Sequence, residues 1–553
     1  MSPVKESRNT VRQALLFFAL LAGALKTCAQ TTWLQPAAFD AAAVAADDLA
    51  REAAGALPLY GRSLPLLVTN QVAGTWRVDG GERVWQLGIR SPGALALECL
   101  LDHVDVPTGS TLRVLSPAGR PLGGPVPLDL AAGTAEFSTP LVAGDSCILQ
   151  YREPVDAAEP GTFRLAKIGH AYRSVEPWTA REGSCHVNVA CEPESDGWEG
   201  PIQATVRISV VVPEGTGWCT GTLVNNVRQD CAPYILTAFH CGRTSTAAQF
   251  NQYKFYFNFQ YATCNGGSYS TAQYLTGAQL KAYSDDYAPQ FQGVGGSDFM
   301  LLRAHADVPG SFNPYWAGWD ASNIPGVSAD GVCIHHPTGA PKRISSFTET
   351  VTTGDPMASS GLMSHYKVKW APTQNGFGVT EVGSSGSGLF KPSGTMGPLL
   401  IGTLTGSSAG MNCTNNGGTA YFGKMSYHWT NNPNTASLKL RPWLDPDNTG
   451  TLAMAGSAQP CSPAIGLPEF DLARTVRPAP NPADDHVVLL IPAGVPLPAR
   501  AILVDALGRT VAERILQFDR EVIPTRHLPA GLYALQVQQA NGPLSNARLL
   551  ISH

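Results

Sequence analysis

The chain has 553 residues, enough for about three or four domains. Only 15% of them are charged, and the 56 glycines and 43 prolines are typical of β-rich exported proteins rather than helical cytosolic enzymes. A net charge of -5 lacks the basic excess that displaces counterions from a phosphate backbone, so we expect no nucleic-acid partner.

Residues 1–29 are predicted to be a signal peptide. Lys5, Arg8 and Arg12 precede an apolar stretch over 14–25, and Ala29 is a small residue at the expected cleavage position. The stretch is shorter than the roughly 20 residues of a spanning helix, and no other uncharged run reaches that length, so we expect no transmembrane anchor. In an exported protein, the twelve cysteines are expected to form disulfides.

Residues 30–182 show the alternating apolar and polar pattern of β-strands, for example over 84–90 and 111–115. They hold no cluster of catalytic or ligating residues. Because the segment lies between a signal peptide and a cysteine-rich segment, we interpret it as a β-sandwich pro-region.

Residues 183–455 contain eight of the cysteines and recurrent apolar strands such as 204–210. They predict one large all-β domain or two stacked barrels. A proline-rich linker follows over 456–470, and short strands return over 471–553, a length typical of a small sandwich. The sequence therefore predicts an all-β chain.

Three short stretches of the segment 183–455 carry chemically active residues. His240 follows a strand, Asp298 precedes one, and Ser385 lies in a Gly/Ser loop. Taken singly, each has a plainer explanation: a structural histidine, a turn aspartate and a flexible loop. Together they match the chymotrypsin-like order, in which a carboxylate orients the histidine that takes the serine proton. Glycines around Ser385 predict an oxyanion hole made by the amides of Gly383 and Ser385.

The segment from 183 to 455 resembles the trypsin-fold serine peptidases, and most closely the bacterial lysyl endopeptidases. The resemblance is carried by Thr-Ala-Phe-His-Cys over 237–241 and by further matches over 219–226, 316–320, 334–337, 342–345 and 443–446. It implies a two-barrel trypsin-like protease domain, a serine endopeptidase acting on protein or peptide substrates. No cofactor and no metal site are expected.

The resemblance also implies three disulfides, Cys185–Cys413, Cys191–Cys264 and Cys219–Cys241. Two cysteines of the segment remain, and we expect them to form a fourth bridge, Cys231–Cys333. A bridge between Cys99 and Cys147 is expected in the pro-region.

The substrate pocket departs from the lysyl endopeptidase pattern. Ala420 aligns with the pocket aspartate of that family, and Thr405 aligns with a histidine beside the pocket. An uncharged pocket does not offset the desolvation of a lysine ammonium, so we expect small or apolar P1 residues rather than lysine. Thr405, Gly406 and Ser407 are expected to pair with an extended substrate. As an alternative, an asparagine reaches the pocket: Asn412, Asn415 or Asn416.

Activation departs from the digestive zymogens as well. Ser384 stands where those proteins carry the aspartate that pairs with a freed N-terminal amine, so that ion pair is not expected. Control is expected to rest on the pro-region, with maturation near Arg181 to Gly183.

Residues 471–553 resemble the type A sorting domain of the type IX secretion system, in the segments 480–483, 505–509 and 528–533. The resemblance implies an Ig-like β-sandwich recognised by the type IX secretion machinery. It also implies export across the inner and outer membranes of a diderm bacterium, to the medium or the cell surface. The alternative is an ordinary accessory sandwich.

The whole chain is thus interpreted as a secreted, monomeric serine endopeptidase precursor. Two other interpretations remain open: a catalytically inactive binding protein on the same fold, and a surface adhesin built of β-sandwiches.

Overall fold

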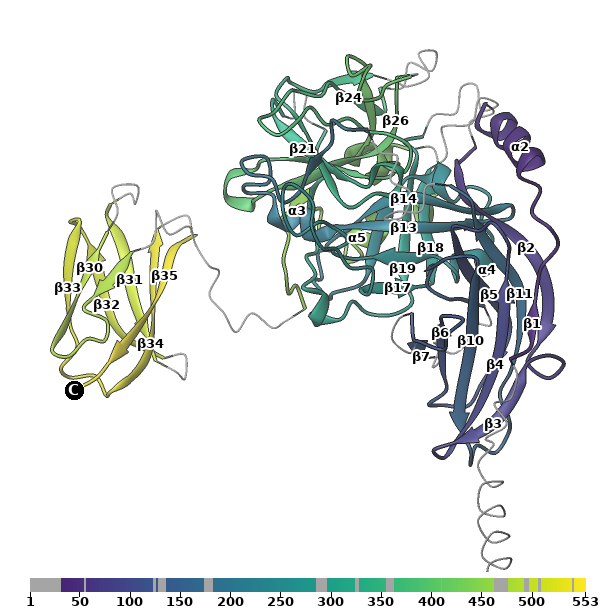
Figure 1. Ribbon diagram of the computed structural model, residues 1–553. Helices are drawn as coiled ribbons and strands as arrows, with labels where there is room; N and C mark the ends of the chain where they lie inside the picture. The colour runs from purple at the N-terminus through teal and green to yellow at the C-terminus, as the bar shows by residue number, and fades with distance from the viewer. Residues whose placement is uncertain are drawn as a thin grey trace, which may run out of the picture. The chain divides into compact units, whose positions relative to one another are not determined.

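The computed structural model forms two compact units, Met1–Cys461 and Ser462–His553, which are described separately (Figure 1). The residues that it describes are 31–53, 56–122, 126–127, 136–173, 183–284, 296–323, 328–354, 363–408, 410–432, 434–461, 476–491, 497–505, 509–539 and 542–553. The expected signal peptide, most of the linker and the residues expected to precede the maturation bond lie outside these ranges. Within them, no helix has the length and apolarity needed to cross a membrane. Strands dominate, which confirms the predicted β class.

The N-terminal segment, residues 31–173, consists of two facing sheets and one helix. Its elements are β1 (Trp33–Leu34), α2 (Ala41–Ala53), β2 (Leu59–Thr69), β3 (Thr75–Asp79), β4 (Glu82–Arg90), β5 (Ala96–Asp105), β6 (Thr111–Leu115), β7 (Val126–Pro127), β8 (Phe137–Ser138), β9 (Val142–Ala143), β10 (Ser146–Pro154) and β11 (Thr162–Ala171). One sheet has the order β1-β4-β10-β6-β7, with β3 on β4. Buried side chains of β4, β10, β5 and β11 fill the space between the sheets, as the alternating sequence pattern requires.

Helix α2 was not predicted from the sequence, where only the strand pattern was considered. Seven of its thirteen residues are alanine, the strongest helix former. The Asp40 carboxylate accepts hydrogen bonds from the amides of Ala42, at 3.1 Å, and Ala43, at 3.0 Å, and so satisfies donors that the first turn leaves open.

The middle segment, residues 183–461, contains two sheets. Its first part comprises β12 (Val187–Asn188), α3 (Glu199–Ala204), β13 (Thr205–Val212), β14 (Gly215–Leu223), β15 (Tyr234–Thr237), η1 (Phe239–Cys241), α4 (Ala247–Phe250), β16 (Lys254–Tyr256), β17 (Tyr274–Thr276), β18 (Ala278–Ser284) and β19 (Phe299–Ala304). Its second part comprises η2 (Gly310–Phe312), β20 (Gly318–Asp320), β21 (Gly331–His335), η3 (Pro337–Gly339), β22 (Arg343–Phe347), β23 (Thr352–Gly354), β24 (His365–Val368), β25 (Gly388–Lys391), η4 (Gly394–Met396), β26 (Leu399–Ser407), β27 (Ala420–Lys424), η5 (Tyr427–Asn431), η6 (Ala436–Leu438), α5 (Arg441–Leu444) and β28 (Ala453–Met454).

The sheet of the first part continues into the N-terminal segment. Its twelve strands follow the order β17-β16-β13-β14-β2-β11-β5-β8, with β15, β18, β19 and β9 attached to this path. We call it the shared sheet, because β2 of the N-terminal segment pairs with β14 of the middle segment (Figure 1). The second sheet has ten strands in the order β12-β22-β21-β25-β26-β27-β24-β23, with β20 and β28 attached. The strand pattern in the sequence did not predict a sheet common to both segments.

The disulfides agree with three of the four expected pairings in the middle segment: Cys185–Cys413, Cys191–Cys264 and Cys219–Cys241 are bonded. The expected Cys231–Cys333 bridge is wrong, because Cys231 is bonded to Cys461. Cys333 is a free thiol at 0% exposure on β21, where its sulfur lies 3.1 Å from the Ser387 hydroxyl. Cys231 lies in a loop and has a positive φ of 58°. The expected pairing considered only the two cysteines left over in residues 183–455, so it overlooked Cys461 in the linker.

The Cys99–Cys147 bridge is also absent. Both cysteines are buried free thiols in the core between the two N-terminal sheets, Cys99 on β5 and Cys147 on β10. The adjacent Cys147 and burial together raise the pKa of the Cys99 thiol. The Cys99 sulfur therefore remains neutral in this apolar core.

The C-terminal unit has its own core between two small antiparallel sheets. Its strands are β29 (Arg477–Ala479), β30 (His486–Leu490), β31 (Ala499–Val504), β32 (Thr510–Leu516), β33 (Arg520–Pro524), β34 (Gly531–Gln539) and β35 (Gly542–Ile551). The sheet orders are β29-β30-β33 and β32-β31-β34-β35. Alternate residues of β30, β31 and β34 are buried in one cluster.

Candidate active site

His240 and Asp298 meet where two neighbouring strands of the shared sheet end. β15 leads into η1, which carries His240, and it pairs with β19, which begins directly after Asp298. Asp298 Oδ2 lies 2.7 Å from His240 Nδ1, and Asp298 Oδ1 accepts the His240 amide at 2.9 Å. The carboxylate is fully buried, while 11% of the histidine side chain is exposed. An ionised carboxylate only accepts hydrogen bonds, so this contact requires the proton on Nδ1 and leaves Nε2 as the basic nitrogen.

Ser385 lies in the loop before β25 of the second sheet, against the chain that carries His240. Its carbonyl oxygen accepts the Thr220 amide at 2.8 Å and lies 3.9 Å from Cys241 Sγ. The next residue, Gly386, has a φ of +82°, and a Cβ atom there would lie 2.1 Å from Thr237 Oγ1. Only glycine fits this position, so the sequence Ser-Gly brings Ser385 close to β15, which ends at Thr237, three residues before His240.

The predicted oxyanion loop, residues 381–385, is attached to β14. The Thr220 hydroxyl donates to the Gly383 carbonyl at 2.9 Å, while the Thr220 amide donates to Ser385. Gly383 has a φ of +90°, and a Cβ atom there would lie 2.9 Å from the Gly339 nitrogen. With both carbonyls bonded to β14, the loop has one fixed backbone course.

A second support of this loop was not found from the sequence. Glu381 Oε2 accepts the Gly183 amide at 3.2 Å and lies 3.1 Å from His186 Nε2. Burial alone would raise the pKa of the Glu381 carboxyl, but the contacts with His186 and Gly183 hold that pKa below its ordinary value. Because Glu381 is four residues before Ser385, the start of the middle segment is tied to the loop despite the absence of an aspartate at Ser384.

Three ligand-type atoms from His186, Glu381 and Cys413 lie within 4.8 Å of one another. The Cys413 sulfur is bonded to Cys185, so it is not a thiolate. The group therefore leaves two ligands, fewer than a structural metal site uses.

Ser384 has a structural partner rather than an ionic one. Its hydroxyl lies 2.8 Å from His335 Nδ1, and His335 Nε2 lies 2.9 Å from the Ser345 hydroxyl. Burial lowers the pKa of His335 well below its ordinary value, so this histidine is neutral. A neutral hydrogen-bonded chain thus fixes the residue between the two predicted oxyanion donors.

The predicted substrate edge lies on β26 and β27. Ser407 pairs with Ala420, and a register shift between Leu404 and Gly406 leaves Thr405 at a bulge. The Thr405 hydroxyl lies 2.9 Å from His365 Nε2, and burial lowers the pKa of His365 to about 4. Thr405 thus contacts a neutral histidine on β24, which sequence reasoning did not single out.

Ala420 is fully buried, in an apolar cluster with side chains of β24 and β27. A Cβ atom at Gly406 would meet nothing within 4 Å, so the surface beside that residue is open. Of the asparagines considered for the pocket, Asn412, Asn415 and Asn416, the first two bond to each other through their backbones in a tight turn.

Comparisons with known proteins agree on the class of this site. Residues 179–423 match the sequence profile of the family described as "Lysyl endopeptidase, C-terminal domain". A curated relative, from Pseudomonas aeruginosa, is 26% identical over 346 residues, which cover 59% of this chain and 69% of that protein. The chain is therefore a hydrolase of the serine protease class, and its substrates are peptides or proteins. The particular protein that it resembles in Pseudomonas aeruginosa is named lysyl endopeptidase.

Solved structures with similarity to the chain include two further proteases. The thermostable serine protease AL20 from an extremophilic microorganism is 16% identical, with a TM-score of 0.29, and the match covers 41% of this chain and 93% of that chain. The protease Anisep from Arthrobacter nicotinovorans is 18% identical, with a TM-score of 0.28, and the match covers 41% of this chain and 92% of that chain. The class assignment rests on the two sequence matches above.

Proposed function

We propose that the chain is the precursor of a secreted serine endopeptidase whose triad is His240, Asp298 and Ser385. The observation that carries the proposal is the 2.7 Å contact between His240 and the buried Asp298, beside the loop of Ser385. Ser385 attacks the peptide carbonyl, His240 takes its proton and later gives one to the leaving amine, and Asp298 holds the histidine tautomer.

The amides of Gly383 and Ser385 then stabilise the oxyanion that forms on the carbonyl oxygen. The attachment of the Gly383 and Ser385 carbonyls to Thr220 supports this role, because it holds the peptide units that follow each donor before substrate binds. Preorganised donors of this kind need no rearrangement when the charge develops.

The proposed substrate pocket is uncharged at its base. Ala420 is surrounded by apolar side chains, and Thr405, Gly406 and Ser407 form the strand edge that pairs with substrate. A lysine ammonium at Ala420 would lose water without gaining a carboxylate. We therefore assign this enzyme small or apolar P1 residues, unlike the preference implied by the name of its relative.

The remaining segments complete the precursor. Residues 1–29 act as the signal peptide, 30–182 as the pro-region and 471–553 as a type IX sorting domain that directs export across the outer membrane. The separate core of the C-terminal unit supports its treatment as an independent module.

Labelling with a fluorophosphonate tests the catalytic assignment. We expect one labelled site, which mass spectrometry maps to Ser385 and which disappears in Ser385→Ala. Ser393→Ala, beyond β25 in the same polypeptide, serves as the matched control and should label like the wild type. Full labelling and peptide hydrolysis in Ser385→Ala would identify a different nucleophile, and no labelling of the wild type would favour a non-catalytic binding protein.

A series of peptides that differ only at P1 tests the specificity. The kcat/KM for alanine and valine should exceed that for lysine by at least tenfold, since one uncompensated charge costs several kcal/mol. Ala420→Asp should raise the relative rate for lysine and lower that for valine. A clear preference of the wild type for lysine would mean that a carboxylate elsewhere in the chain reaches the pocket.

A further inference from the structure

The edge of β14 is shaped to receive a strand of the N-terminal segment. Gly215 pairs with Arg62 and Gly217 pairs with Leu59, so glycine recurs at alternate positions where β2 crosses. A Cβ atom at Gly215 would lie 2.1 Å from the Gly61 carbonyl oxygen, and one at Gly217 would lie 2.6 Å from Leu57. Neither glycine has a positive φ, so close approach rather than backbone freedom explains both.

Aromatic and apolar side chains of the two segments share the same cores. Tyr60 of β2 stacks on Trp218 of β14 with ring centroids 4.2 Å apart, and its hydroxyl lies 2.7 Å from Ser209 Oγ. The two rings belong to one buried cluster with Ala171 of β11 and Tyr256 of β16. If the segments separate, the Tyr60 side chain becomes exposed to water. It then loses the free energy of both stacking and burial.

A charged pair is buried between the segments. Glu98 of β5 and Lys254 of β16 form an ion pair in which each side chain is 1% exposed, and Ser138 of β8 also contacts the ammonium. Burial lowers the pKa of Lys254, whereas Glu98 acts in the opposite direction. Salt screens a pair excluded from water far less than it screens a surface pair.

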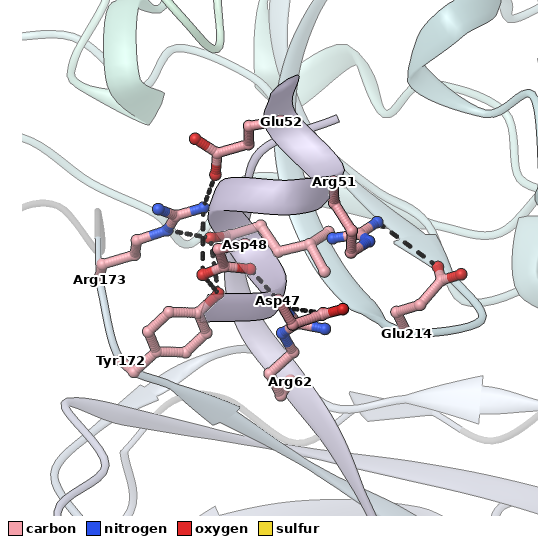
Figure 2. A network of polar contacts seen from close by, with 9 residues as sticks. Asp47, Asp48, Arg51, Glu52, Arg62, Tyr172, Arg173 and Glu214 are labelled. Carbon is pink, nitrogen blue, oxygen red and sulfur yellow. Dashed lines mark hydrogen bonds and ion pairs between the residues drawn. The ribbon is translucent and has the colours of Figure 1, made fainter. Parts of the chain in front are cut away.

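Helix α2 fastens the end of the N-terminal segment. Figure 2 shows Asp48, which is buried, receiving the Tyr172 hydroxyl at 2.6 Å and the guanidinium of Arg62. Arg173 pairs with Glu52 and donates from Nε to the Leu59 carbonyl at 2.6 Å. The last described residue of the N-terminal segment is thus tied to both α2 and β2.

The same helix reaches the middle segment. Arg51 of α2 lies 3.7 Å from Glu214, in the turn between β13 and β14 (Figure 2). This pair is partly exposed and adds little energy by itself. The position of the pair is more important than its energy. It adds a polar contact at the turn directly before Gly215 and Gly217 of β14.

We propose that residues 31–173 are a lasting subunit of the protease, and that they stay bound by strand pairing after the chain is cut within residues 174–182. The proposal goes beyond the proposed role of a pro-region that acts before maturation. It does not depend on the identity of the natural cutting enzyme or on catalysis by Ser385.

The subunit has a consequence for the active site through β14. The first residues of this strand pair with β2, and its middle carries Cys219, bonded to Cys241, and Thr220, which holds the loop of Ser385. The bound segment therefore supports the strand on which both His240 and the oxyanion loop rest.

The test uses the full chain with Ser385→Ala and the recognition sequence of a site-specific protease placed within residues 174–182. After complete cutting, size-exclusion chromatography at micromolar concentration and 1 M NaCl should show one peak that contains both fragments. Elution of the N-terminal fragment in a separate peak overturns the proposal. Because the protein carries Ser385→Ala, this result is independent of whether the proposed catalytic function is correct.

Variants identify what holds the two fragments together. Gly215→Val should weaken association of the cut protein at least tenfold, measured as the dissociation constant of a labelled N-terminal fragment. Gly310→Val is the matched control, because a Cβ atom at Gly310 meets nothing within 4 Å, and it should leave the constant unchanged. Tyr60→Ala is a second variant for the case in which Gly215→Val does not fold. If the variants that fold bind as tightly as the wild type, the proposed strand interface is wrong.

Discussion

The two catalytic halves of the middle segment are held by different means. In the shared sheet, whose strands position His240 and Asp298, β14 of the middle segment pairs with β2 of the N-terminal segment. The second sheet, which leads to Ser385, lies wholly within residues 187–454 and is tied by the Cys185–Cys413 bridge at its edge. The first half thus has non-covalent support from outside the segment in addition to its own Cys219–Cys241 bridge, whereas the second half draws all its strands from within the segment.

The proposed catalytic residues come from both halves and are held in place in different ways. Two of the three proposed catalytic residues are fixed by strand ends, whereas Ser385 and the oxyanion loop are fixed by hydrogen bonds that cross from one half to the other. A site assembled from two differently supported halves is sensitive to changes in either one.

The largest expected effect comes from removing catalytic groups on opposite halves. Ser385→Ala and His240→Ala should each reduce kcat by roughly 10⁴-fold to 10⁶-fold, and the double variant should be little worse than either one. Such non-additivity is expected because serine attack needs the histidine base. Steady-state hydrolysis of a P1-alanine peptide measures it, with unchanged thermal unfolding as the control for folding. Multiplying losses in the double variant would mean that the halves act independently.

Two disulfides with nearly equal loops separate stability from positioning. Cys185–Cys413 spans 228 residues and Cys231–Cys461 spans 230, so removing either should lower the free energy of unfolding by a similar amount, about 5 kcal/mol in the chain-entropy model. Replacing both cysteines of a pair by serine tests this in urea. Only the loss of Cys185–Cys413 should also lower kcat, because that bridge lies beside Gly183 and Glu381. Equal effects on kcat would show that the bridge has no special influence on the loop.

Glu381 offers a smaller and more local test of the second half. Glu381→Ala removes the acceptor of the Gly183 amide and the partner of His186, and kcat should fall by about tenfold to a hundredfold, as for one hydrogen bond to a charged group. The KM should change little, because the loop acts on the oxyanion rather than on bound substrate. Glu381→Gln keeps an acceptor oxygen and should recover most of the activity. If both variants match the wild type, Glu381 does not position the loop.

Lys342 is expected to affect stability rather than kcat, and it reports on the contact between the halves. Its ammonium lies on the second half and donates to the Ile202 carbonyl on the first, and burial lowers its pKa from 10.5 to about 7. Between these values the unfolded chain binds more protons, so the contribution of Lys342 to stability rises with pH, by at most about 1.4 kcal/mol per pH unit. Its penalty is complete below pH 7.

The measurement compares urea unfolding of wild type and Lys342→Met at pH 7 and at pH 9.5. The free energy of unfolding of the wild type should gain on that of the variant over this interval. A pH-independent difference would mean that Lys342 is charged in both states.

The candidate catalytic residues could be predicted from the sequence because each lies in a short stretch with a recognisable residue pattern. His240 and Asp298 lie next to strand ends and Ser385 lies in a Gly/Ser loop, in a recognisable order, and the glycine after Ser385 is required by a close contact. The pairs that fix the loop could not be predicted in this way. Glu381 meets His186 across 195 residues and His335 meets Ser384 across 49, with no local pattern that indicates either contact.

The fold divides along the same line. Alternating patterns predicted the β class and the strands of the N-terminal segment, but which strands pair across segments depends on shape. Gly215 and Gly217 were visible in the sequence, yet glycines in a strand favour several explanations until the partner strand is known. The Cys231–Cys461 bridge illustrates the same limit, since cysteine spacing does not determine connectivity.

The three free cysteines in the described part of the chain have a practical consequence. Cys99, Cys147 and Cys333 are buried, Cys99 and Cys147 in the N-terminal core and Cys333 in the second half, where burial raises its pKa to about 12. Thiolates rather than thiols react with alkylating reagents, so each sulfur stays inert until its surroundings open. Timed alkylation followed by peptide mapping would therefore measure when each of these regions opens, with the protein's own cysteines as the reactive groups. The three thiols therefore report the order in which these regions of the molecule unfold.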